Sequence, residues 1–544
     1  MKKYYYLLFF YLCFSLVNLL RAQPLEKLSA KDYLDEQDYN SALVEYLKLY
    51  KGNKNDPEIN FQIGYCYLSI NDDKSKAIPY LEFVLKKGGF TDELLLYLGM
   101  SYMYAYKFDD AIKILSNYKE KVGPKKQDKV IQLIDNCESA KLLMKTPLNV
   151  TFENLGKDIN STYPDYYPFL TQDQSTLYFT TRREGKSQKI KSWQGYYTSD
   201  IYFSKVVGGQ WTKPKSVGPV INSIEDEQCV YLSPDGKKMI VYKDNEIDSG
   251  DLFYTSMAGK SKTFSKPLSF PDPVNTVNLE LEACITNDEN MIIIASDREG
   301  GLGETDLYLF KKLPNGEWGN PVNLGPNINT KYKESFPVFD EKNSILYFAS
   351  NGRFGMGGFD IFKSNFDLET QSFGLAENMG YPINTPEENM EFTLAENKRD
   401  GYIAAVRKEG YGDLDIYKVI FNEIENKSSI IKGVISTSDT LKKGIDAAVF
   451  LLEEKTNIII DSLSVNPNSG KYVFSVYPGK YILHVKSPGF EEYSCKINVL
   501  DKSDYVFEIE KNIVILKTGQ SLQLKQNELS KETNSIPPKT NIKK

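Results

Sequence analysis

The sequence predicts a multidomain chain in which an all-α region of helical repeats is followed by an all-β propeller and a small all-β sandwich. Three observations predict this order. Small and aromatic residues recur every 34 or 35 positions near the N-terminus, an Asp-apolar-aromatic triplet recurs five times at intervals of 51 to 55 residues, and four short β-type segments begin at residue 430. A chain of 544 residues is also too long for one hydrophobic core.

The first 22 residues have the pattern of a secretory signal peptide. Lys2 and Lys3 precede an uncharged, mostly apolar run over residues 4–20, and Ala22 supplies the small residue before a cleavage point. The alternative is a membrane anchor over residues 4–20, because this run is just long enough to cross a thinned bilayer. We expect export with removal of residues 1–22 and a periplasmic mature chain; the cell surface is the other location.

An all-α domain is expected over residues 24–146, with three helical repeats and a capping helix. Small residues let paired helices approach closely, and aromatic side chains fill the gaps beside them. The pattern resembles the tetratricopeptide repeat, with signature residues Ala30 and Tyr33, Gly64 and Tyr67, and Gly99 and Tyr102. Such an array forms a concave groove for a partner segment or packs against the neighbouring domain, and both interpretations stay open.

Five four-strand units are expected over residues 147–425. Each unit follows an Ile-Asn or Val-Asn pair, and its third strand follows a Gly-rich loop and begins with a repeated Asp. The units resemble PD40 (WD40-like) repeats of TolB-type propellers, which implies radially arranged blades. Residues 151–156 repeat the end of a unit before the first complete one, so we expect them to complete the last of five blades; six is the alternative. The repeated aspartates are Asp200, Asp251, Asp306, Asp360 and Asp415.

Charged residues recur at equivalent positions of these units. They form either a network inside each blade with the repeated Asp, which their regular placement favours, or a ring at the propeller mouth that grips a partner. Cys229 and Cys284 align with Tyr167, Phe336 and Phe392 on the first strands, and packing is expected of them. The acidic set is Asp165, Glu227, Glu282 and Glu334, and the basic set is Arg183, Lys243, Arg298, Arg353 and Arg407.

A small sandwich is expected over residues 428–512 and a disordered tail over residues 513–544. Four short strands, joined in one place by the turn Pro478-Gly479, suit a compact β-sandwich. The segment resembles the carboxypeptidase regulatory-like domain, which implies a transthyretin-like fold without peptidase chemistry. The final residues are rich in Lys, Gln, Ser and Asn, a composition that is typical of a flexible tail.

The sequence offers little for catalysis. His484 is the only histidine and lies in a predicted strand, which removes triads and histidine-based zinc sites, and there is no Cys-x-x-Cys motif. The net charge of −7 carries no dense basic patch, so nucleic acid is not expected as a partner. We expect no enzyme activity, no cofactor, no metal and no small-molecule substrate. The alternative is a propeller that binds glycans or hydrolyses them with paired carboxylates.

The order of the modules resembles envelope proteins of Bacteroidota, namely the PorE-type OmpA-family proteins of the type IX secretion and gliding machinery. Those proteins add an OmpA-like domain that binds peptidoglycan, whereas about 30 residues follow the expected sandwich here. The resemblance therefore implies a periplasmic adaptor that contacts envelope or outer-membrane proteins, with direct peptidoglycan binding in doubt. A surface-exposed adhesin is a further alternative.

Overall fold

The computed structural model describes residues 28–518 apart from 186–194, 245–249, 258, 260–262, 368, 396, 398, 423–428, 438–444, 466, 468 and 500–507. The expected signal peptide therefore lies outside the described residues, as does the tail beyond residue 518. The chain divides into two compact units, Met1–Phe421 and Asn422–Lys544. Among the helices that the structure describes, none combines the length and the apolar character needed to cross a membrane.

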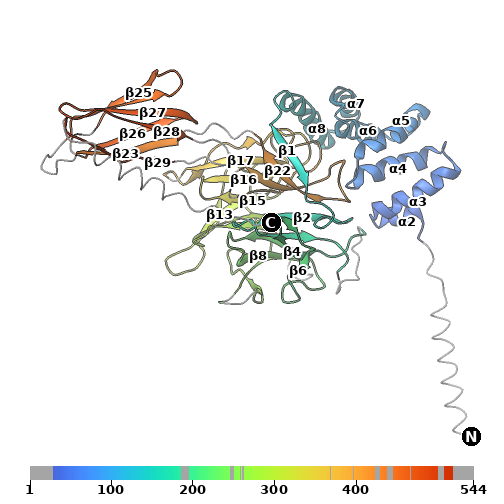
Figure 1. Ribbon diagram of the computed structural model, residues 1–544. Coiled ribbons are helices and arrows are strands. Elements are labelled where there is room, and N and C mark those ends of the chain that lie inside the picture. The colour runs from blue at the N-terminus through green and yellow to red at the C-terminus, as the bar shows by residue number, and fades with distance from the viewer. Residues whose placement is uncertain are drawn as a thin grey trace, which may run out of the picture. The chain divides into compact units, whose positions relative to one another are not determined.

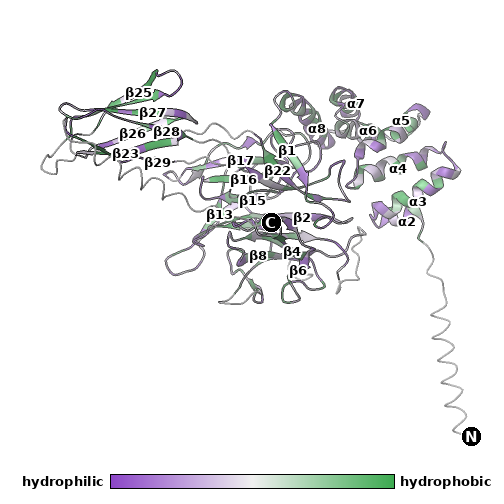
Figure 2. Cartoon of the chain, viewed as in Figure 1, coloured by the Kyte–Doolittle hydropathy of each residue, from purple (hydrophilic) through white to green (hydrophobic). Residues whose placement is uncertain are grey.

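Seven α-helices form the N-terminal part of the first unit, and each packs against its neighbours in the chain (Figure 1). Ser29 and Asp32 form a capping box at the first helix, and Asp56 with Pro57 begins the third. The helices carry both hydrophobic and hydrophilic residues (Figure 2), as is typical of helices with one face buried and the other exposed to solvent. The helices are α2 (Ala30–Asp35), α3 (Tyr39–Gly52), α4 (Pro57–Ser69), α5 (Ile78–Lys87), α6 (Glu93–Tyr104), α7 (Phe108–Lys121) and α8 (Pro124–Leu143), with a 3₁₀ turn at Lys74–Ala77 before α5.

The small residues of the helical repeat lie where helices approach most closely. A Cβ atom on Gly64 would lie 2.5 Å from Leu81 Cδ2, and one on Gly99 would lie 2.6 Å from Leu115 Cγ. Ala30 is buried in the same kind of contact. The expectation that these positions permit close helix packing is confirmed.

Five antiparallel sheets of four or five strands follow the helices. Each begins with a strand that forms a β-hairpin with the next, and the short outer strands end the sheet. The first sheet contains β2 (Asp165–Leu170), β3 (Thr176–Thr181), β4 (Asp200–Val207), β5 (Gln210–Trp211) and β6 (Lys215–Ser216). The second contains β7 (Glu227–Leu232), β8 (Lys238–Lys243), β9 (Asp251–Ser256) and β10 (Leu268–Ser269), and the third β11 (Glu280–Ile285), β12 (Met291–Ser296), β13 (Asp306–Lys311) and β14 (Val322–Asn323). The fourth contains β15 (Glu334–Asp340), β16 (Ile345–Ser350), β17 (Asp360–Asp367), β18 (Ser372–Phe373) and β19 (Glu377–Asn378), and the fifth β20 (Phe392–Leu394), β21 (Asp400–Ala405), β22 (Asp415–Phe421) and β1 (Val150–Asn154).

The sheets form a closed, propeller-like ring. The first strands β2, β7, β11, β15 and β20 contact one another in that order, and Thr393 Oγ1 of β20 donates to Pro168 O of β2 at 2.8 Å. The strand before the first complete unit, β1, pairs with β22 of the last, from Val150 opposite Phe421 to Asn154 opposite Tyr417. The expected completion of the last unit by the N-terminal strand is confirmed, and apolar side chains fill the space between sheets.

In the third, fourth and fifth sheets, the Gly-rich loop packs against the segment that leads into the next sheet. Three residues before the repeated Asp, Gly303 lies so close to the following unit that a Cβ would be 2.2 Å from Tyr332 O and 2.4 Å from Thr330 O. Gly357 and Gly412 occupy the same position against Pro386 and Thr162. A backbone oxygen cannot yield as a flexible side chain can, so glycine is required here.

We expect Gly303→Ala to lower the free energy of unfolding by about 1–3 kcal/mol, because the added methyl group overpacks this backbone contact. Gly52→Ala is the matched control, since a Cβ on Gly52 would have no atom within 4 Å. Urea unfolding of the full chain measures both. Equal stability of the two variants would contradict the contact.

The second unit is a sandwich of two four-stranded sheets with a continuous apolar core. Residues Ile513–Ile515 form a strand that pairs in parallel with Ile435–Thr437, and Ile513 and Ile515 are buried. The prediction that a disordered tail begins at residue 513 is therefore wrong, because these alternating isoleucines complete the core. The sheets contain β23 (Ser429–Thr437), β26 (Lys471–Val476), β29 (Glu508–Glu510) and β30 (Ile513–Ile515), and β25 (Ile459–Ser464), β24 (Ala448–Glu453), β27 (Gly479–Lys486) and β28 (Tyr493–Val499).

Candidate functional site

The repeated aspartates close the Gly-rich loops. Asp306 accepts hydrogen bonds from the backbone N–H groups of Leu302 (2.5 Å) and Gly303 (3.1 Å), and Asp360 accepts from those of Met356 (2.8 Å) and Gly357 (3.1 Å). Asp415 accepts from the amide of Tyr411 at 2.6 Å. Asp200 and Asp251 likewise begin the third strands of their sheets. This use of a carboxylate organises a loop and requires no ligand.

The Asn of each Ile-Asn or Val-Asn pair fastens its loop to the preceding sheet. Asn329 Oδ1 accepts from Leu307 N at 2.9 Å, and Asn329 Nδ2 donates to Leu307 O at 3.0 Å. The same two hydrogen bonds recur in all five units, between Asn160 and Ile416, Asn222 and Ile201, Asn275 and Leu252, Asn329 and Leu307, and Asn384 and Ile361. The amide thus acts as an extra backbone partner for the third strand.

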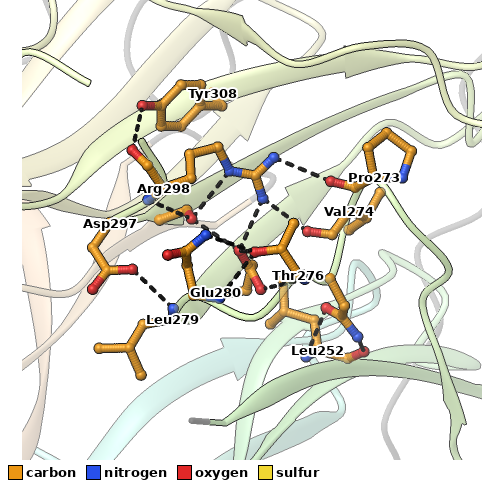
Figure 3. Close-up of polar contacts among 12 residues, drawn as sticks. Leu252, Pro273, Val274, Thr276, Leu279, Glu280, Asp297, Arg298 and Tyr308 are labelled. Carbon is orange, nitrogen blue, oxygen red and sulfur yellow. Dashed lines mark hydrogen bonds and ion pairs between the residues drawn. The ribbon is translucent and has the colours of Figure 1, made fainter. Parts of the chain in front are cut away.

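Acidic and basic repeat residues form ion pairs inside three of the five sheets. In the third sheet Arg298 Nη2 lies 2.9 Å from Glu280 Oε1, and the guanidinium also donates to Pro273 O (3.1 Å) and Val274 O (2.9 Å) (Figure 3). The equivalent pairs are Asp165–Arg183 at 2.6 Å and Glu227–Lys243 at 2.9 Å. In the fourth and fifth sheets Arg353 and Arg407 bind the carbonyl oxygens of Pro326 and Pro382. These contacts support a network inside the blade for the first three sheets, in which the ion pairs join the acidic and basic residues.

One acidic member of that set was misassigned. Glu280, the first residue of β11, makes the pair with Arg298, whereas Glu282 is the third residue of the strand. The alignments of Cys284 and Phe392 with Tyr167 are also wrong. Cys284 lies two residues after the position equivalent to Tyr167, and Phe392 lies one residue after it. A constant spacing of five residues after the repeated Asn, as from Asn275 to Glu280, was the signal that identifies the correct positions.

The correct alignment places two carboxylates, Glu282 and the unpredicted Glu391, seven residues after the repeated Asn of their units. Tyr167, Cys229 and Phe336 occupy this position in three units, and Glu282 and Glu391 occupy it in the other two. Both glutamates are almost fully buried. They line a cavity of about 400 Å³. Its other lining residues include Gln37, Tyr39, Asn40, Asn71, Tyr166, Tyr167, Arg182, Tyr196, Gln228 and Phe336.

Tyr167 connects the two carboxylates. Its hydroxyl donates to Glu282 Oε1 at 3.2 Å, and its backbone N–H donates to Glu391 Oε2 at 2.5 Å. Burial raises the pKa of Glu282 to about 7 and that of Glu391 to about 8, and the charge on Glu282 adds to the rise at Glu391. The cavity therefore holds two carboxyl groups that are poised to change charge near neutral pH.

The helices form one side of this cavity. They cover the loops of the fourth, fifth and first sheets through polar contacts, including Asn136 to Gly357 O (2.5 Å) and Asn71 to Asp413 (2.7 Å), together with an ion pair of Lys74 and Glu387. Met356 from a Gly-rich loop is buried in the core of α6, α7 and α8. The helical array thus packs against its neighbouring domain, as one of the two interpretations required. Tyr33, Tyr67 and Tyr102 are partly buried and pack against the hydrophobic core of the helices.

Four cysteines of the first unit are buried in packed positions. Burial raises the pKa of Cys66, Cys137 and Cys284 to about 12, and Cys229 is also buried, as a packing role requires. For Cys229 and Cys284 this role was expected. His484 lies on β27, where Nδ1 is 2.6 Å from Ser494 Oγ. Within the described residues, no group of three or more His, Cys, Asp and Glu side chains is arranged to bind a metal ion.

Comparisons with known proteins give distant likenesses only. No family model matches the sequence, and no curated protein matches it. Among solved structures, TolB from Acinetobacter baumannii is 13% identical over 48% of this chain and 56% of its own, with a TM-score of 0.31. An α-L-arabinofuranosidase from Lactobacillus brevis is 12% identical over 48% of this chain and 91% of its own (TM-score 0.31), and the β-propeller domain of Cps50 from Myceliophteria thermophila is 10% identical over 35% and 48% (TM-score 0.22). The propeller-like architecture therefore rests on the strand pairing described above.

Proposed function

We propose that this chain is an exported, periplasmic interaction scaffold of the cell envelope that contacts envelope or outer-membrane proteins. Under this proposal the helices are tetratricopeptide repeats, the five sheets are PD40-type blades, and the second unit is a transthyretin-like, carboxypeptidase regulatory-like domain. The type IX secretion and gliding machinery is the proposed setting.

One observation carries the scaffold proposal: the polar residues that recur in the units are used by the fold itself. The repeated Asp and Asn bind backbone groups, and in three sheets an acidic residue pairs with a basic one, as Glu280 does with Arg298. A motif whose side chains bind one another and the backbone provides a rigid surface. The polar contacts between helices and sheets join both into one unit, which suits an adaptor.

Affinity purification of the full chain with chemical crosslinking, from envelopes of the native bacterium, tests this proposal. We expect the same outer-membrane or secretion-system proteins in every preparation, crosslinked to lysines of this chain. An exported, tagged protein of unrelated fold is the control. Recovery of this chain alone, or of the same proteins with the control, would contradict the scaffold.

The second candidate, a propeller that binds or hydrolyses glycans, would use the two carboxylates of the cavity, Glu282 and Glu391. Glycosidases use two carboxyl groups, of which one must be ionised when the other is protonated. Here burial raises the pKa of both Glu282 and Glu391, so neither is held permanently ionised at neutral pH. Hydrolysis of a polysaccharide panel by the wild-type chain, abolished in Glu282→Gln and Glu391→Gln, would establish this candidate in place of the scaffold.

A further inference from the structure

The cavity beside Glu282 and Glu391 has an entrance and a polar interior. Gln37 and Asn40, from the end of α2 and the start of α3, are exposed where they border it, whereas Glu282 is only 7% exposed. A volume of about 400 Å³ is within the range of small-molecule pockets. A small group can therefore enter from the helix side and reach buried carboxylates.

Glu282 has an unused acceptor in this cavity. The carboxylate accepts from the Tyr167 hydroxyl through Oε1 and also interacts with the Ser335 side chain and the Phe336 backbone N–H, whereas Oε2 is buried without a partner at hydrogen-bond distance. A buried acceptor without a partner costs free energy comparable to a lost hydrogen bond, and more when it is charged. The structure thus contains a site that a donor, above all a charged one, would stabilise.

The two carboxylates also lack a counter-ion among the described residues. Arg182, the cation that lines the same cavity, is paired with Asp226 at 3.2 Å, and no cation contributes to the pKa of Glu282 or Glu391. The other titratable groups that face the pair or the walls around it are phenols, namely Tyr39, Tyr166, Tyr167, Tyr196 and Tyr242. Ionisation of both glutamates would therefore place two uncompensated negative charges in one buried space.

Aromatic rings surround the carboxylates. The ring centroids of Tyr166 and Tyr167 are 5.5 Å apart, and those of Tyr167 and Phe336 are 5.6 Å apart. Aromatic faces attract cations, and the attraction strengthens when water is excluded. Carboxylates combined with aromatic rings are suited to an alkylammonium group, whose charge binds the carboxylates while its carbon atoms contact the rings.

We propose that this cavity binds a primary alkylammonium group, with Glu282 and Glu391 as its counter-ions. The ammonium has three donors, which match Glu282 Oε2 and the second carboxylate. A divalent metal ion fits less well, because Ca²⁺ and Mg²⁺ require six or more oxygen ligands and the cavity presents two carboxylates. The ammonium comes from a free amine or from a lysine side chain of a peptide, and the site is independent of the proposed scaffold function.

Calorimetric titration of the full chain with n-butylammonium chloride at pH 8.5 and pH 6 tests the proposal. The ammonium stays protonated at both values, whereas Glu282 and Glu391 lose their charge at pH 6. We expect binding at pH 8.5 that weakens at least tenfold at pH 6, and release of protons on binding near pH 7.5. 1-Butanol at the same concentration controls for the apolar part, and a capped lysine peptide distinguishes a peptide from a free amine as the source.

Two variants locate the site. Glu282→Gln and Glu391→Gln keep the shape of the side chain and remove its charge, so each is expected to weaken butylammonium binding at least tenfold. Glu225→Gln, at an exposed glutamate of a nearby loop, is expected to bind as the wild type does. The proposal fails if 1-butanol or a neutral sugar binds equally well, if the two variants bind normally, or if no heat appears at 10 mM ligand and pH 8.5. Near-ultraviolet circular dichroism establishes that each variant is folded.

Discussion

Replacing Arg298 by alanine is expected to lower the free energy of unfolding of the first unit by about 3–5 kcal/mol, because the change leaves a buried charge without its partner. The side chains of Arg298 and Glu280 are 7% and 0% exposed. The guanidinium also binds the carbonyl oxygens of Pro273 and Val274 and lies over the rings of Tyr308 and Phe310. Loss of one side chain therefore removes an ion pair, two backbone contacts and aromatic packing.

Urea unfolding followed by tryptophan fluorescence measures this effect, since the three tryptophans, Trp193, Trp211 and Trp318, all belong to the propeller sequence. Lys333→Ala is the control. Its ion pair with Glu304 spans 3.6 Å between side chains that are 47% and 62% exposed, so its loss should change stability by less than about 1 kcal/mol. Equal effects of the two substitutions would show that the charged repeat residues do not support the fold.

Glu282→Gln is expected to make the first unit more stable at alkaline pH. Burial raises the pKa of Glu282 to about 7, so the folded state holds a proton that the unfolded state releases near its ordinary pKa of 4.5. Stability is therefore lost as the pH rises from about 4.5 through 7, by about 3 kcal/mol for this group. Removing the titrating group removes that loss. Glu391→Gln acts in the same direction.

Urea midpoints at pH 5 and pH 9 test the sign. The fall in stability between these values should be smaller in Glu282→Gln than in the wild type by about 3 kcal/mol, and unchanged in Glu225→Gln. Other buried carboxyls, such as Asp360 with its pKa raised to about 7, are present in all three proteins and cancel in the comparison. A Glu282→Gln protein that is less stable than the wild type at pH 9 would contradict the buried, unpaired state of this carboxylate.

Periodic features of the fold could be predicted from the sequence. Gly64 and Gly99 recur because helices cross closely beside Leu81 and Leu115, and the repeated Asp recurs because each Gly-rich loop needs the same acceptor. The pairing of β1 with β22 was predictable from the repeat. The last unit lacks an outer strand, and residues 151–156 have the pattern of such a strand before the first complete unit.

The cavity could not be predicted in the same way. It joins residues of α2 and α3 to the first strands of several sheets, and such contacts depend on how the helices pack on the propeller, which leaves no period in the sequence. Glu282 was assigned to the wrong repeat position, and Glu391 was not selected, because the other three units have no carboxylate at the equivalent position. Residues 513–515 were assigned to the tail because the segment that follows them is rich in lysine. Only the structure shows that Ile513 and Ile515 are buried in the sandwich.

A crosslink between the ends of the ring tests the central claim, that residues 150–421 close into one ring of five sheets. Thr151 of β1 lies opposite Ile420 of β22, so cysteines at both positions are close enough to form a disulfide. In oxidised, monomeric Thr151→Cys/Ile420→Cys, mass spectrometry of a proteolytic digest should find these two segments joined. In Thr151→Cys/Ser269→Cys, which places the second cysteine on another sheet, it should not. A Thr151–Ile420 pair that stays reduced, or that joins only separate chains, would contradict the closed ring.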